Sequence, residues 1–178
     1  MMLEIWDGYN EKEELLGVDL VRGKEIPKGV YHLGVEVLIQ HVDGDYLLMQ
    51  RDFSKVECYP GFYEATAGGS ALKGETAKQA IAREAFEETG VKVENLRLIN
   101  KQILHPTIVY SYLSVVDCDK ASVKLQEGET IAYKWLNQKD FMTFMNSDES
   151  IPMKRDRLGS YLNSIRKPHT AIFATLPK

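Results

Sequence analysis

The stretch GSALKGETAKQAIAREAFEETGV, residues 69–91, carries the strongest pattern in this chain of 178 residues. The apolar positions that recur at the period of an α-helix are Ala77, Ala80, Ile81 and Ala85. They predict a helix over 76–89. Gly90 follows directly and is suited to end that helix, because glycine readily adopts the left-handed conformation of a C-cap.

Three carboxylates share one side of the predicted helix: Glu84, Glu87 and Glu88. Side chains three and four residues apart are neighbours on a helix, so these like charges repel unless a positive charge lies among them. A run of charges on a helix usually indicates a solvated face. Here Glu84 and Glu88 continue the apolar stripe, and an inward carboxylate must be protonated, paired or bound to a metal. The positions therefore favour a divalent cation.

The spacing of the fixed residues resembles the Nudix box, the signature of the Nudix hydrolases. The matching residues are Gly69, Glu75, Arg83, Glu84, Glu87, Glu88 and Gly90. Ala85 departs from the pattern, since the family usually has a larger aliphatic residue there, but no chemical group is lost. The resemblance implies an α/β protein with the Nudix fold, an α/β/α sandwich with a mixed β-sheet. It also implies hydrolysis of a diphosphate linkage.

The resemblance assigns roles to individual residues. It makes Glu84, Glu87 and Glu88 ligands of Mg²⁺ or Mn²⁺, and it makes Glu87, Glu88 and Arg83 catalytic. It gives Arg51, Gly68 and Gly69 a place in substrate binding, and Gly69, Glu75 and Gly90 a structural role in the box. A general base is also sought in the loop that carries Glu127 and Glu129, for which a solvated acidic loop is the alternative. Carboxylates without Cys or His suit Mg²⁺, which prefers hard oxygen donors.

Length and pattern predict one domain, with a hairpin extension at 1–28, a core at 29–166 and a tail at 167–178. Alternation predicts strands near 3–6 and 16–22, at 29–40 and 44–50 as a hairpin, near 62–67, and at 91–104, 107–116 and 131–136. Further helices are expected at 140–146 and 154–166. Strands on both sides of a helix, followed by closing helices, indicate a mixed sheet between helices.

The formal net charge of −4 gives no general attraction to nucleic acids or anionic membranes. We therefore expect a small diphosphate substrate and neither nucleic acid nor membrane as a partner. The first residues lack the basic and apolar regions of a signal peptide, which predicts a cytoplasmic protein. The N-terminal hairpin packs either on its own domain or on a second copy, so a homodimer stays open.

Two other functions compete with a hydrolase acting on a nucleoside diphosphate linked to another moiety. The segments IWDGYNEKEELLG, YHLGVEVLI and PGFYEATAGG resemble isopentenyl-diphosphate isomerases, which act on an isoprenoid diphosphate. Their catalytic cysteine aligns with Gly68 and a metal-binding histidine with Ser70, so the isomerase lacks its acid. The third alternative is an inactive binding module, which the complete set of box glutamates disfavours.

Overall fold

The computed structural model describes residues 3–56 and 59–166. The strands are β1 (Ile5–Tyr9), β2 (Leu15–Val21), β3 (His32–His41), β4 (Tyr46–Arg51), β5 (Tyr63–Glu64), β6 (Ala67–Ser70), β7 (Arg97–Leu104), β8 (Thr107–Val116) and β9 (Thr130–Leu136). The helices are α1 (Ala77–Thr89), α2 (Gln138–Met145) and α3 (Pro152–Arg166), with a short 3-10 turn at Lys120–Ser122. The expected tail at 167–178 lies outside the described residues.

Strand β3 is the centre of a mixed sheet. It runs parallel to β8 along its whole length, and β7 pairs antiparallel with the far side of β8. On its other edge, β3 pairs antiparallel with β6 over Gly34–Val37 and meets β4 only at Gln40, opposite Tyr46. Strand β4 then pairs with β5 and β9. Two arms of the sheet thus share one edge of β3, and the site described below lies beside the β6 arm.

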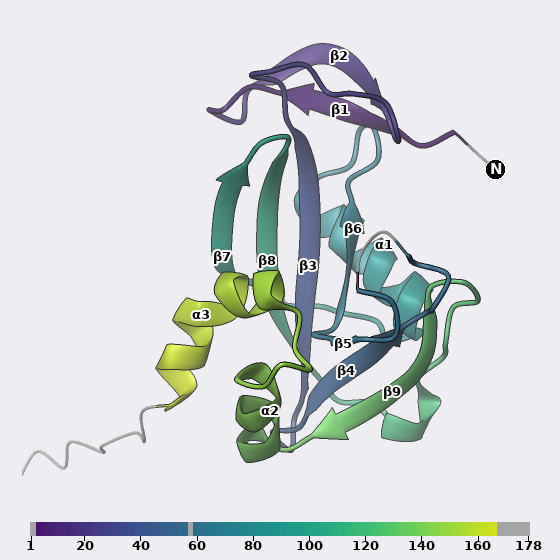
Figure 1. Cartoon of the computed structure of the whole chain (residues 1–178), viewed down its shortest axis with the longest axis vertical. Coiled ribbons are helices and arrows are strands. Elements are labelled where there is room, and N and C mark those ends of the chain that lie inside the picture. The colour runs from purple at the N-terminus through teal and green to yellow at the C-terminus, as the bar shows by residue number, and fades with distance from the viewer. Residues whose placement is uncertain (1–2, 57–58, 167–178) are drawn as a thin grey trace, which may run out of the picture.

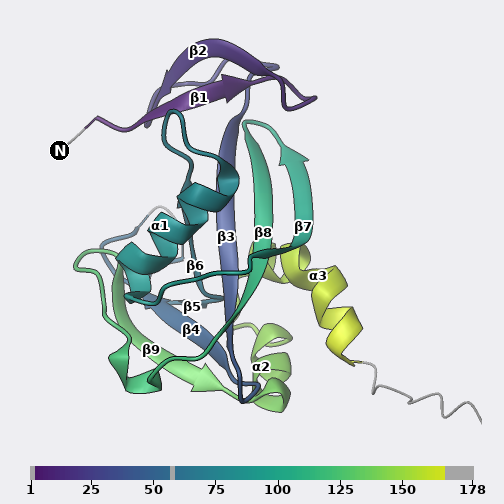
Figure 2. The same ribbon diagram turned by 180° about the vertical axis from the view of Figure 1, so that it is seen from behind.

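Helices cover both faces of this sheet, which confirms the expected α/β/α sandwich. Figure 1 shows α2 and α3 in front of the strands, and Figure 2 shows α1 on the opposite face. Side chains alternate along β3: Val35, Val37 and Ile39 pack in the cluster with α1, whereas Leu38 packs in the cluster with α2 and α3. Full burial of an aliphatic side chain of this size contributes about 1.5–3 kcal/mol. The alternating side chains of β3 therefore pack against both helix layers.

Local sequence signals fix both ends of α1. The Thr76 side chain accepts a hydrogen bond from the backbone N–H of Gln79, and the Gln79 side chain accepts one from the backbone N–H of Thr76, which forms a capping box. At the other end, Gly90 has φ 70° and its N–H donates to Phe86 O. The expected helix is confirmed, with Thr76 as its N-cap. The stripe places Ala80, Ile81 and Ala85 in the core.

Three expectations about strands need correction. The hairpin predicted from 29–40 and 44–50 exists only at its turn, because most of that edge of β3 is taken by β6. The strand near 62–67 is divided into β5 and β6. The strand predicted over 91–104 begins only at Arg97, and the preceding residues connect it to α1. Alternation found the extended segments but could not identify their partners.

The N-terminal hairpin packs on its own domain. Strands β1 and β2 form a separate two-stranded sheet that lies across one end of the main sheet, at the top of Figure 1. Two backbone hydrogen bonds of 2.8 Å join Tyr9 and Tyr31, and the N–H of Lys73 donates to Ile5 O at 2.8 Å. The hairpin is thereby attached both to the residue that precedes β3 and to the loop before α1. A homodimer stays a prediction.

No helix among the described residues is long and apolar enough to cross a membrane.

Candidate active site

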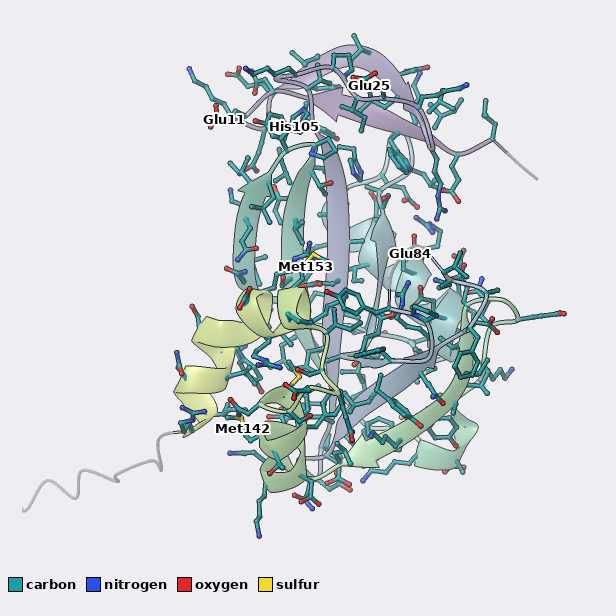
Figure 3. The ribbon with its side chains drawn as sticks, viewed as in Figure 1. Glu11, Glu25, Glu84, His105, Met142 and Met153 are labelled. Atoms are coloured by element: carbon teal, nitrogen blue, oxygen red, sulfur yellow. The ribbon has the colours of Figure 1, made fainter. Side chains whose placement is uncertain are left out.

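A pocket of about 770 Å³ lies between the N-terminal hairpin, β6 and α1. From α1, the side chains of Arg83, Glu84, Glu87 and Glu88 line it. Gly68 and Gly69 of β6 form a second wall, and the hairpin supplies a third. Figure 3 shows Glu84 reaching from α1 into the region below the hairpin. With Glu129 from the loop before β9, seven residues proposed from the sequence for metal, substrate or catalysis therefore share one cavity.

Arg83 holds the box together through its guanidinium. Its Nε and Nη2 donate to the two carboxylate oxygens of Glu75 at 2.8 and 2.9 Å. Its Nη1 donates to Glu84 at 2.9 Å and to Glu87 at 3.2 Å, and its Nη2 also donates to Ser70 O at 3.1 Å. Arginine suits this role because its planar fork offers several donors in fixed directions. Arg83 and Glu75 thus connect α1, its preceding loop and β6.

Glu84 lies directly against the glycine strand. A Cβ atom at Gly69 would lie 2.2 Å from Glu84 Oε1, far inside van der Waals contact. At Gly68 the same atom would lie 2.7 Å from Val35 O on the neighbouring strand. Side chains at these two positions would displace either the carboxylate or β3. The glycines are therefore required by close approach on both sides of β6.

Glu88 is the most deeply buried carboxylate of the helix, with only 6% of its surface exposed. Burial, together with the nearby carboxylate of Glu64, raises its pKa to about 8. The pKa of Glu84 is also raised, chiefly by burial, although Arg83 opposes the shift. Both groups consequently gain strongly from an added cation. Glu87 is more exposed than Glu84 and also lines the pocket.

Arg51 lies on the other side of β6, in a network of buried charges. Its Nη1 pairs with Glu64 Oε1 at 2.7 Å, and Glu64 Oε2 lies 3.2 Å from Lys154 Nζ. Lys154 also pairs with Glu36 at 3.0 Å, and Arg157 pairs with the same carboxylate at 3.1 Å. These groups border a smaller cavity of about 270 Å³, which Gly68 and Gly69 separate from the carboxylate pocket. The structure therefore places Arg51 near the site but in a different cavity.

One residue of this network, Glu36, could be suspected from the sequence. Glu36 is a charged residue within the apolar strand HLGVEVLIQH, and such a residue needs a buried partner. Its partners come from α3, more than a hundred residues later, so their identity was not readable. The structure also adds Lys55 to the pocket, a residue that sequence reasoning did not single out.

The two acidic loop residues separate in the structure. Glu129 lines the pocket and forms an ion pair with Lys55. Glu127 is exposed and does not contribute to the pocket lining, which agrees with the solvated alternative for that residue. Of the two proposed bases, only Glu129 is close to the box glutamates.

The donor set fits a divalent ion in its chemistry. Glu84, Glu87 and Glu88 offer hard oxygens in one pocket, two of them with raised pKa values. As arranged here, no three Asp, Glu, His or Cys side chains within residues 3–56 and 59–166 converge closely enough to form a metal cluster. Glu84 and Glu87 instead accept hydrogen bonds from Arg83. To bind an ion, the carboxylates of Glu84 and Glu87 would have to rotate away from the Arg83 guanidinium.

Comparison with known proteins agrees with this geometry. The NUDIX domain family matches residues 30–156, which is more than half of the chain. An uncharacterised Nudix hydrolase of Listeria monocytogenes is 31% identical over 152 residues, covering 84% of this chain and 89% of the relative. The chain therefore belongs to the Nudix hydrolase family. It is a hydrolase of the pyrophosphohydrolase type, in a family that generally uses divalent metals.

Two further similarities bear on fold and on the extent of the match. The crystal structure of DR0079 from Deinococcus radiodurans superposes with a TM-score of 0.67 at 20% identity, covering 92% of this chain and 98% of that one. This likeness supports the Nudix fold. An NAD-capped RNA hydrolase of Haemophilus influenzae is 34% identical over 79 residues, which is 43% of this chain and 29% of the relative. Nothing in the comparisons supports the isomerase alternative.

Proposed function

We propose that this hydrolase cleaves the diphosphate of a nucleoside diphosphate linked to another moiety, with Mg²⁺ or Mn²⁺ held by Glu84, Glu87 and Glu88. The observation that carries the proposal is the burial of Glu88, with its pKa raised to about 8, in the same pocket as two further box carboxylates. Such a group gains most from a bound cation. A bound ion would neutralise the diphosphate and activate a water molecule for attack on phosphorus.

The residues of the chain divide the remaining work. Arg83 fixes Glu84 and Glu87 through hydrogen bonds and is itself fixed by Glu75. Gly68 and Gly69 leave the space along β6 that a diphosphate needs, and Arg51 approaches this strand from the far side. A carboxylate in the pocket, Glu87, Glu88 or Glu129, accepts the proton of the attacking water.

The substrate is proposed to be a small molecule in the cytoplasm, without nucleic acid or membrane as a partner. The supporting observation is the formal net charge of −4, which disfavours long polyanions. The similarity to an NAD-capped RNA hydrolase covers less than half of this chain. An NAD-capped RNA is therefore included among the substrates tested below.

The isomerase alternative is weaker on the geometry of the same pocket. Gly68 and Ser70 line it where an isomerase would carry cysteine and histidine. Within the described part of the chain, no thiol contributes to the lining of this pocket. Among the described residues, no sulfur acid is therefore placed for an alkene protonation in this pocket.

A substrate panel tests the proposal. The protein would be incubated with Mg²⁺ or Mn²⁺ and nucleotide sugars, ADP-ribose, dinucleoside polyphosphates, nucleoside triphosphates, NAD-capped RNA or isopentenyl diphosphate. Phosphorus NMR detects cleavage, and deuterium uptake detects isomerisation. We expect cleavage of a nucleoside diphosphate derivative and loss of turnover by orders of magnitude in Glu87→Gln and Glu88→Gln.

A matched control separates chemistry from folding in this test. Glu94→Gln makes the same substitution at an exposed carboxylate beyond α1 and is expected to keep full turnover. Deuterium uptake into isopentenyl diphosphate would favour the isomerase. Tight binding of a panel member without any turnover would favour the binding module.

A further inference from the structure

Four cationic side chains line the carboxylate pocket: Arg22, Lys55, Lys73 and Arg83. Two of them, Arg83 and Lys55, are held very differently. Arg83 makes five hydrogen bonds, to Glu75, Glu84, Glu87 and Ser70. Lys55 reaches the pocket from the loop after β4. Within residues 3–56 and 59–166, the side chain that forms an ion pair with it is Glu129. A flexible lysine held at one point is the more easily displaced of the two.

Local backbone contacts deliver Lys55 to this position. The N–H of Lys55 donates to Asp52 O at 3.2 Å, and the N–H of Ser54 donates to Asp52 Oδ1 at 2.7 Å, which closes a compact turn. The N–H of Asp52 in turn donates to Glu129 O at 2.9 Å. The turn and the loop before β9 are thereby joined. Lys55 and Glu129 consequently meet at one rim of the carboxylate pocket.

Lys55 also acts on the deepest carboxylate. Its side chain is only 24% exposed, and burial lowers its pKa, while attraction to Glu88 is the largest opposing influence. Conversely, Lys55 counteracts the burial that raises the pKa of Glu88. Charges that are partly shielded from water interact far more strongly than exposed ones. The ammonium group is therefore part of the charge balance at Glu88 and Glu129.

We propose that Lys55 is an internal counter-ion at the corner between Glu88 and Glu129, and that a divalent cation binds there only by displacing its ammonium group. This inference rests on the proposed function, since it concerns the same metal site. It makes Lys55 a positioning residue that weakens metal binding in the free protein and leaves the corner when the metal enters. Glu129 is released from its ion pair by the same event.

Metal binding without substrate tests this directly. Mn²⁺ affinity would be measured by titration calorimetry for the wild-type protein, Lys55→Gln, Lys55→Arg and Glu88→Gln. We expect Lys55→Gln to bind Mn²⁺ roughly tenfold more tightly, because a competing positive charge is removed. Lys55→Arg keeps the charge and should stay close to wild type. Lys73→Gln is the matched control, because Lys73 lines the same pocket but pairs with Asp19.

The outcomes separate this inference from the proposed function. Equal Mn²⁺ affinity in wild type and Lys55→Gln, with weaker binding in Glu88→Gln, overturns the inference and leaves the metal site standing. An equal gain of Mn²⁺ affinity in Lys73→Gln also overturns the inference, because removing any positive charge from the pocket would then have the same effect. Equal affinity in all variants, including Glu88→Gln, overturns both.

A chemical readout checks displacement itself. Amine acetylation followed by mass spectrometry reports how accessible each lysine is, with and without saturating Mg²⁺. We expect the acetylation rate of Lys55 to rise with Mg²⁺ while that of Lys73 stays constant. An unchanged or slower rate at Lys55 would show that its ammonium group stays in place when the ion binds.

Discussion

Arg83 and Glu75 form a two-point ion pair across the loop that leads into α1, with Nε to Oε1 at 2.8 Å and Nη2 to Oε2 at 2.9 Å. The same guanidinium contacts Glu84 and Glu87. Paired, parallel hydrogen bonds of this kind add direction as well as energy. The position of two proposed metal ligands thus depends on a residue that need not touch the metal.

Arg83→Lys should damage the site although it keeps the charge. A lysine ammonium cannot reproduce the fork, so we expect a loss of about 1–3 kcal/mol in the free energy of unfolding, measured by urea denaturation. Mn²⁺ affinity and turnover should fall as well, because Glu84 and Glu87 lose their common anchor. Glu75→Gln should cause a similar loss of stability. Full activity in both variants would contradict this role of the pair.

Gly69→Ala should reduce metal binding more than stability. The added methyl group would overlap Glu84 Oε1, at 2.2 Å, and push the carboxylate away from the pocket. We expect weaker Mn²⁺ binding in calorimetry and a lower kcat. Gly159→Ala is the control, because a Cβ there meets no atom within 4 Å. In helix α3 that change should stabilise the protein by up to about 1 kcal/mol.

Lys154→Met should be among the most destabilising single changes in the protein. It would leave the buried carboxylates of Glu36 and Glu64 without a shared partner. Breaking a buried ion pair from one side typically costs about 3–5 kcal/mol, which urea denaturation would measure. Adding Glu64→Gln should recover part of the loss. Lys139→Met, at an exposed position of α2, should change stability little.

His32 should make the protein sensitive to acid. Burial lowers its pKa to about 4, so the folded state keeps the ring neutral where the unfolded chain, with a pKa near 6.5, binds a proton. The stabilisation is therefore complete above about pH 6.5 and is lost as the pH falls toward 4. It amounts to about 3 kcal/mol at most.

The His32 effect is isolated by comparing variants. His32→Gln should show a shallower loss of stability between pH 6.5 and pH 4 than the wild-type protein, in urea denaturation at several pH values. His105→Gln, at an exposed histidine, should follow the wild-type curve. Parallel curves for wild type and His32→Gln would show that His32 titrates normally in the folded protein.

Prediction from sequence succeeded where the determining contacts are local. The limits of α1 follow from Thr76, Gln79 and Gly90, all within a few residues of the helix ends. Strand pairing failed where it depends on distant segments: β6 replaces β4 along most of β3, and hydrophobic alternation holds no information about that choice. Helix α3 was expected, but its contribution to buried charges beside β6 was not.

The candidate site shows the same division. The carboxylates and glycines of the box share a pocket because they lie on one helix and the strand before it. Lys55 and Glu129 join them through two loops that approach each other only in the folded chain. Arg51 is in the expected strand, yet its pairing with Glu64 places it in the neighbouring cavity. The spacing of residues in the sequence therefore identified the carboxylates and glycines of the box, but it did not identify all the residues that line the pocket.

The hairpin of β1 and β2 has a practical consequence for anyone who shortens this protein. The family match begins at residue 30, whereas Trp6 and Arg22, which help to enclose the carboxylate pocket, lie before it. A version trimmed to the matched region would keep every residue of the box, but it would lose the hairpin side of the carboxylate pocket. Weak activity in such a version would reflect the loss of the hairpin side of the pocket and not a defect in the box residues.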